Sequence, residues 1–148
     1  MNQHKRARGR RPKAVHPLVF SLLGTAEAVQ TRLEAALRRL GLSLAKAGVL
    51  MHLAEAGESL PLHELAERQS CVRSNITQLV DRLEKDGLVR RGGDPADRRS
   101  IRASLTPTGK RAYARARQVL GEEQRAIVGA LSARDTATVE RALRSLSR

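Results

Sequence analysis

The chain has few of the residues on which several protein classes depend. It has 148 residues and one cysteine, so no disulfide can form within it. One Phe, one Tyr and no Trp are too few for the stacking platforms that bind single-stranded nucleic acid. The longest apolar run, 17–24, is far shorter than the ~20 residues of a membrane-spanning helix. We therefore expect no integral membrane protein, and the single cysteine fits a reducing, cytoplasmic location.

Sequence patterns typical of enzymes and metal centres are also missing. The four histidines form no metal-ligand spacing with the one cysteine, and no glycine-rich phosphate loop or nucleophile elbow occurs. We therefore expect no enzyme, no catalytic residues, no metal and no cofactor.

Positive charge is what the chain has in excess. It carries 28 Lys and Arg against 15 Asp and Glu, a formal net charge of +13, which indicates a polyanionic partner such as duplex nucleic acid. Residues 1–16 are basic without any acidic residue, and Gly9 and Pro12 oppose a helix there. We predict a disordered basic arm that either contacts DNA phosphates or serves as a solubilising tail.

Long amphipathic helices are predicted at both ends of the chain. Apolar residues recur at helical spacing over 17–40 and over about 107–131, and a last helix follows the capping pair Ser132 and Asp135. Such helices need an apolar surface to cover, and the ~65 residues between them offer little. This favours a homodimer in which the terminal helices meet.

Three shorter helices are predicted between these ends. Ser43 is the expected N-cap of the first, which ends before Gly57. A turn at Ser59-Leu60-Pro61 then precedes a short helix over about 62–69. The next helix starts after Ser70 and ends at Gly87. Its expected inward face is Val72, Ile76, Leu79, Val80 and Leu83. Its polar face is Arg73, Ser74, Asn75, Thr77, Gln78, Asp81 and Arg82.

A basic β-hairpin is predicted over 88–105. The periodicity there changes to rough alternation on both sides of the tip Gly92-Gly93-Asp94-Pro95. Its arginines are Arg90, Arg91, Arg98, Arg99 and Arg102. The predicted fold class is thus mainly α with a small β-hairpin, and the order of elements is that of a winged helix-turn-helix.

The polar helix face and the hairpin suit the two grooves of duplex DNA. A helix fits the major groove, where Arg73 reaches guanine acceptors or phosphate and Asn75 and Gln78 pair with adenine or bridge through water. Ser74 and Thr77 suit phosphate oxygens or a thymine methyl group. A two-stranded finger with arginines at its tip suits a narrow minor groove, where the potential is most negative.

Several segments of the chain resemble one known family. They are Leu42-Ser43, Val49-Leu50, Leu53, Glu64-Leu65-Ala66-Glu67, Val80 to Val89, Asp97-Arg98-Arg99 and Leu105-Thr106-Pro107-Thr108-Gly109. Over about residues 42–113 the chain resembles the MarR family of bacterial transcriptional regulators. The most specific part is the Asp-Arg-Arg sequence followed closely by Leu-Thr-Pro-x-Gly.

The resemblance implies a homodimer on a pseudo-palindromic site in double-stranded DNA, acting as a repressor. The implied domains are the arm 1–16, a dimerisation helix 17–40, a winged helix-turn-helix domain 42–106 and C-terminal dimerisation helices 107–148. A weakly specific architectural DNA-binding protein is the alternative, which the ratio of operator to random-duplex affinity would distinguish.

The resemblance also assigns roles within the hairpin. By the family's pattern Arg99 enters the minor groove, Arg98 holds a phosphate, and Asp97 orients an arginine through a charge-assisted hydrogen bond. Asp97 as a cap of the hairpin turn is the alternative. The full set of residues expected to bind DNA is Arg73, Ser74, Asn75, Thr77, Gln78, Arg82, Arg91, Asp97, Arg98 and Arg99.

Two further questions stay open in the sequence. The family resemblance implies a ligand pocket between the winged domain and the dimer helices, but Lys46-Ala47 stands where many members carry Gln and an aromatic. A small-molecule effector is thus undecided, and Met51, His52 and His63 are either pocket residues or ordinary core and surface residues. Cys71 is either a redox-active thiol close to a helix N-terminus or a small residue that packs the turn.

Overall fold

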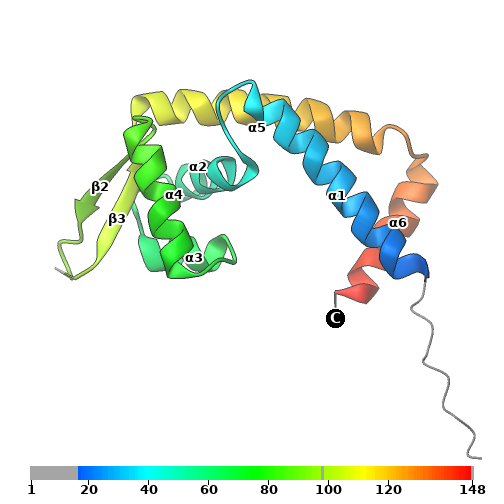
Figure 1. The fold of residues 1–148 in the computed structure, drawn as a ribbon, viewed down its shortest axis with the longest axis horizontal. Helices are drawn as coiled ribbons and strands as arrows, with labels where there is room; N and C mark the ends of the chain where they lie inside the picture. The colour runs from blue at the N-terminus through cyan, green and yellow to red at the C-terminus, as the bar shows by residue number, and fades with distance from the viewer. Residues whose placement is uncertain (1–16, 98, 148) are drawn as a thin grey trace, which may run out of the picture.

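The computed structural model describes residues 17–97 and 99–147, and within them the predicted fold class is confirmed. The elements are α1 (Pro17–Arg38), α2 (Leu44–Ala56), β1 (Leu60–Pro61), α3 (Leu62–Arg68), α4 (Arg73–Lys85), β2 (Val89–Gly93), β3 (Ile101–Leu105), α5 (Pro107–Val128) and α6 (Ala133–Leu146). In Figure 1, α5 runs from the base of the β2–β3 hairpin across to α1 and α6. The predicted arm 1–16 and Arg98 lie outside the described residues.

Capping side chains start the helices where the sequence places them. Ser43 Oγ accepts a hydrogen bond from Lys46 N at 3.2 Å, and Ser132 Oγ accepts one from Asp135 N at 3.2 Å, so both predicted caps are confirmed. The first helix ends at Arg38, two residues earlier than the spacing predicts. Gly41 follows in the left-handed conformation (φ 70°), which reverses the chain towards α2.

The sheet has three strands, so the prediction of a simple turn at 59–61 is wrong. Leu60 and Pro61 form the short strand β1, which pairs antiparallel with β3 at Leu60↔Ala103 and Pro61↔Arg102. β3 also pairs with β2, giving the order β1-β3-β2. A proline is tolerated in an edge strand because its missing N–H need not bond to a neighbour. The pairing depends on a segment that is distant along the chain, which local turn signals do not encode.

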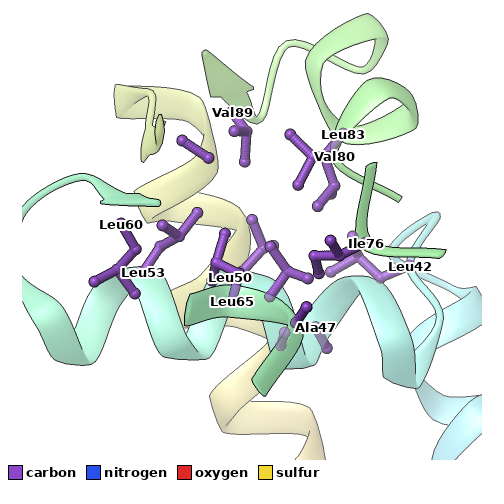
Figure 2. Close-up of a cluster of buried hydrophobic side chains, with 14 of the residues drawn as sticks. Leu42, Ala47, Leu50, Leu53, Leu60, Leu65, Ile76, Val80, Leu83 and Val89 are labelled. Atoms are coloured by element: carbon purple, nitrogen blue, oxygen red, sulfur yellow. The ribbon is translucent and has the colours of Figure 1, made fainter. Parts of the chain in front are cut away.

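The elements from α2 to β3 form the winged unit, and the β2–β3 hairpin is its wing. One hydrophobic core joins the helices of this unit to the sheet. Leu50, Leu65, Ile76, Val80 and Leu83 are each fully buried. Figure 2 shows their side chains meeting between α2, α3 and α4, with Val89 of β2 close by. Because α4 buries three of these side chains, its polar face is held outward on a rigid base.

The start of α5 is fixed tightly against the end of α4. Thr106 Oγ1 accepts a hydrogen bond from Gly109 N at 2.9 Å and donates one to Gly87 O at 2.7 Å. Gly109 is buried, and a Cβ atom there would overlap the backbone oxygen of Leu88. The Leu-Thr-Pro-x-Gly segment therefore joins a helix N-cap to a close backbone approach, which explains the glycine physically.

The two ends of the chain leave apolar side chains in contact with solvent. None of the described residues of α6 is buried, and Val139, Leu143 and Leu146 are 44–61% exposed. On the first half of α1, Phe20 and Leu23 are each 63% exposed. In Figure 1 both segments are at the end of the molecule farthest from the hairpin. Within the described residues, no helix is long and apolar enough to cross a membrane.

Candidate nucleic-acid interface

The outer face of α4 carries the side chains that the sequence assigns to it. Arg73, Ser74, Asn75, Thr77 and Gln78 are all exposed, while Ile76, Val80 and Leu83 of the same helix are buried. Thr77 Oγ1 donates a hydrogen bond to Arg73 O at 2.9 Å, which uses its proton within the helix. The other four side chains form no ion pair within residues 17–97 and 99–147 and point to the surface from which a groove edge is reached. Arg82 is also exposed, but it lies further along the helix.

The turn before α4 differs from its prediction at Val72. This residue is 63% exposed and serves as the N-cap of α4 in an extended conformation (φ −74°, ψ 152°), so it does not lie on the buried stripe. Helical spacing does not apply to a residue that precedes the first helical turn. Beside it, Cys71 is partly buried against the core, and its N–H donates to Ala66 O at 3.0 Å. Ser70 completes the turn with a positive φ of 52°.

The tip of the hairpin is the segment 94–100, because Gly92 and Gly93, which the sequence places in the tip, are paired with β3 as part of β2. Asp97 organises this tip. Its Oδ1 accepts a hydrogen bond from Arg99 N at 2.9 Å, which is the capping contact that the sequence offers as the alternative for this residue. This bond fixes the backbone of Arg99, whose side chain is exposed and, among the described residues, forms no ion pair. The other predicted wing arginine, Arg98, lies outside the described residues.

Among the described residues of the hairpin, Asp94 is the carboxylate that binds an arginine side chain. Its Oδ2 accepts a hydrogen bond from Arg102 Nη1 at 2.9 Å, and its Oδ1 accepts one from Ala96 N at 2.9 Å. The backbone bond from Ala96, and next the bond from Arg102, hold the pKa of Asp94 below its ordinary value. Arg102 also donates to Ser59 Oγ at 2.9 Å, so it ties the hairpin tip to the segment before β1.

Exposed side chains of α4 and of the β2–β3 hairpin lie next to each other on the surface. Arg73 and Thr77 of α4 and Arg99 of the hairpin line a common hollow of about 190 Å³, together with His63 of α3. Two of these side chains come from a helix that suits the major groove, and one comes from a finger that suits the minor groove. The sequence predicts the elements, and the structure shows that they form one surface.

Arg91 has surroundings unlike those of Arg73 and Arg99. Its Nε donates to Glu84 Oε2 at 2.8 Å, its Nη1 donates to Asp81 Oδ1, and its backbone N–H donates to Glu84 Oε1 at 3.1 Å. The backbone bond and the side-chain bond from Arg91 lower the pKa of Glu84. Arg91 therefore joins β2 to α4 through three hydrogen bonds.

Comparison with known proteins identifies the family. The profile of the MarR family matches residues 40–100. Over 110 residues, which are 74% of this chain and 74% of the other, the chain is 33% identical to the homoprotocatechuate degradative operon repressor of Escherichia coli. This chain belongs to the MarR family. It is a transcriptional regulator, and the resemblance inferred from its motifs is confirmed.

Solved structures of the MarR family have the same fold. A MarR family regulator of Streptomyces coelicolor, Sco3205 in complex with DNA, is 28% identical with a TM-score of 0.81 over 94% of this chain and 91% of that one. A mutant of MarR from E. coli, complexed with operator DNA, is 25% identical with a TM-score of 0.79, over 88% of this chain and 93% of that one.

A shorter sequence match, to the Bacillus subtilis regulator YfiV at 39% identity, covers 51% of this chain and 46% of that protein.

A cavity lies where the MarR resemblance implies a pocket. It measures about 390 Å³ between α2 and α5, and its lining includes Met51, Tyr113 and Arg117. His52 does not line it, and its Nδ1 lies 3.8 Å from Glu55 Oε2. His63 belongs to the hollow beside Arg73. Of the three residues weighed as pocket candidates, Met51 alone is placed at this cavity.

Proposed function

We propose that this MarR-family regulator binds a pseudo-palindromic operator in duplex DNA as a homodimer and represses transcription. In each protomer α4 enters the major groove and the hairpin, as a wing, enters the adjacent minor groove. The observation that carries this proposal is the hollow shared by Arg73, Thr77 and Arg99, because it joins a helix and a finger in the arrangement that neighbouring grooves require. The protein acts by binding, not by catalysis, in the cytoplasm.

The exposed side chains of α4 have different roles, some contacting bases and others phosphates. Arg73 binds a guanine edge or a phosphate, and Asn75 and Gln78 read adenine directly or through water. Ser74 and Arg82 contact phosphate oxygens on either side, which fixes the register of the helix in the groove. Thr77 presents its methyl group to the DNA, because its hydroxyl proton is already donated within α4.

The wing acts through the turn that Asp97 organises. Arg99 inserts into the minor groove, where its charge meets the strongest negative potential. Arg98 holds a phosphate beside it. The hydrogen bond from Arg99 N to Asp97 supports this arrangement, since it fixes the backbone from which the Arg99 side chain extends.

Dimerisation is supported by the exposed apolar residues at the chain ends. A helix such as α6, whose leucines and valine stay 44–61% exposed, gains stability only when another surface covers it. The same holds for Phe20 and Leu23 of α1. A second copy that covers both segments at once places the two DNA-binding units in a twofold pair, as a palindromic site requires.

The test is an operator selected from randomised duplexes and titrated with single-arginine variants. Arg99→Ala should weaken operator binding by about fivefold to 150-fold, the loss of a good groove contact of ~1–3 kcal/mol. Arg115→Ala, which removes an equal charge from an exposed position on α5, should change it less than about twofold. Sedimentation should show that both variants remain dimers. Unchanged affinity of Arg99→Ala would reject the wing assignment.

A second candidate function, architectural coating of DNA, is favoured by the net charge of +13. It makes a different quantitative prediction. A regulator should bind its operator at least ~10³-fold more tightly than random duplex at physiological salt, whereas a coating protein binds both nearly equally. Measuring both affinities at one stated ionic strength separates the two, since the nonspecific term is dominated by counterion release.

A further inference from the structure

We propose that Arg91 is a positioning residue that locks the wing onto α4 through Asp81 and Glu84 and does not bind a DNA phosphate. The proposal rests on the proposed operator binding and assigns a role within it. The arginines of the hairpin would then have two different roles. Some contact DNA, whereas Arg91 sets the orientation of the hairpin relative to α4.

The alternation of strand β2 directs Arg91 towards α4. Neighbouring residues of a strand face opposite sides of the sheet. Val89 is buried beneath α4, so Arg91, two residues further on, lies on the same side but beyond the edge of the core. Arg90 lies on the other side, where its Nε donates to Ser104 Oγ of β3 at 3.2 Å. The sheet geometry therefore separates two consecutive arginines.

Asp81 and Glu84 complete the contact from the helix side. They are three residues apart on α4, so their carboxylates lie on one face of the helix. Arg91 uses two guanidinium nitrogens and its backbone N–H against these two residues. Such a fork-like contact with several carboxylate oxygens fixes direction as well as distance, which a single ammonium group cannot do.

The charge of Arg91 is already neutralised in this cluster. One guanidinium faces two carboxylates, so the cluster as a whole presents no positive charge to a phosphate. Arg73 and Arg99, by contrast, form no ion pair in the part of the chain that the structure describes. A DNA phosphate would have to displace both carboxylates from Arg91, and they would then stand unpaired close to the DNA.

Locking the wing matters because the two grooves are a fixed distance apart. The far part of the hairpin is held by Arg102, which binds Asp94 and Ser59. Within β2, Arg91 is the residue whose side chain forms hydrogen bonds to α4. Without it, the wing would need to be ordered on binding, and that entropic cost would reduce affinity.

The decisive experiment compares variants for which positioning and simple electrostatics predict opposite signs. Glu84→Gln and Asp81→Asn each remove a negative charge near the DNA, so charge alone predicts tighter binding. Loss of the lock predicts weaker binding, and we expect operator affinity to fall by about fivefold for Glu84→Gln. Arg91→Lys keeps the charge but loses the fork, and we expect it to lose nearly as much affinity as Arg91→Gln.

The dependence of affinity on salt provides a second, independent readout. Removing a phosphate contact lowers the slope of log affinity against log salt by about one. We expect Arg91→Gln to leave this slope unchanged, and Arg98→Ala, which removes the proposed phosphate contact, to lower it. Arg90→Gln is the matched control, because it removes the same charge from the opposite face of the same strand. It should change affinity less than about twofold.

Integrity of the variants is checked on the full dimer. Amide hydrogen exchange in β2 and β3 should accelerate in Glu84→Gln, while the core of α2 and α3 keeps its protection. The effects of Arg91→Gln and Arg99→Ala on operator binding should be less than additive in the double variant, because both act through the wing. Tighter binding by Glu84→Gln, or a slope lowered by about one in Arg91→Gln, would overturn the proposal. A wild-type protein without operator preference would instead overturn the proposed function.

Discussion

The winged unit and the terminal helices of this regulator differ in how much of their apolar surface the single chain covers. In the winged unit the side chains of Leu50, Leu65, Ile76, Val80 and Leu83 close into a core with exposures near zero. On α6 and the first half of α1, side chains of the same types are 44–63% exposed. The winged unit thus buries its apolar side chains within one chain, whereas the terminal helices leave theirs exposed, which is what the proposed dimer interface requires.

The largest expected effect tests how rigidly the winged unit is joined to α5. Gly109→Ala places a Cβ against the backbone oxygen of Leu88, which cannot move aside as a side chain could. We expect a loss of ~3 kcal/mol or more in unfolding free energy by chemical denaturation. Gly121→Ala on the same helix is the control: its Cβ would lie 3.6 Å from a flexible guanidinium nitrogen of Arg125, and the change should be neutral or stabilising. Equal effects of both would refute this account of the junction.

The next effect tests the terminal helices. Leu143→Glu adds a charge to a side chain that is 45% exposed in the single chain, so folding of the winged unit should not change. If the residue is buried between copies, dimerisation should weaken by ~2 kcal/mol or more. Sedimentation over a concentration series measures this directly. A dimer of undiminished affinity would show that α6 is not part of the interface.

A smaller effect is expected in the turn between α3 and α4. Ser70 has a positive φ of 52°, which a β-branched residue adopts only with strain. Ser70→Val should therefore cost ~1–2 kcal/mol in unfolding free energy, while Ser70→Gly should stay within about 0.5 kcal/mol of the parent. Thermal unfolding of the two variants gives the comparison, and similar melting temperatures would argue against strain at this position.

The smallest effect is the response of the wing to acid. Glu84 and Asp94 have pKa values below their ordinary ones, chiefly through backbone hydrogen bonds from Arg91 and Ala96. Carboxylates with lowered pKa values stabilise the fold above their unfolded pKa of about 4, and this contribution is lost as pH falls through the folded value. Exchange protection of β2 and β3 should be constant from about pH 7 to 5 and decline below about pH 4. Glu84→Gln should show less of this decline.

Local signals account for the features that the sequence predicts correctly. Ser43 and Ser132 cap helices because their hydroxyls reach backbone N–H groups three residues away, and Gly41 reverses the chain because it can adopt a positive φ. The polar face of α4 is likewise readable, since its apolar residues repeat at helical spacing.

The features that the sequence leaves open depend on contacts between distant segments. Strand β1 forms because it pairs with β3, which is distant along the chain. The side chain of Arg91 in β2 binds a carboxylate of α4, which is a different element. Val72 lies outside the buried stripe because the helix begins one residue later. The individual DNA contacts of Arg73, Asn75, Gln78 and Arg99 stay predictions, because they involve a second molecule.

The central claim is that α4 and the wing of each protomer bind DNA as one rigid unit, and that the dimer places two such units on the operator with twofold symmetry. A hydroxyl-radical and methylation footprint of the dimer on its selected operator tests this most directly. The account predicts two protected major-groove segments, centred about 10–10.5 base pairs or a multiple apart, each with a protected minor groove beside it. Protection of a single segment, or uniform protection along any duplex, would contradict it.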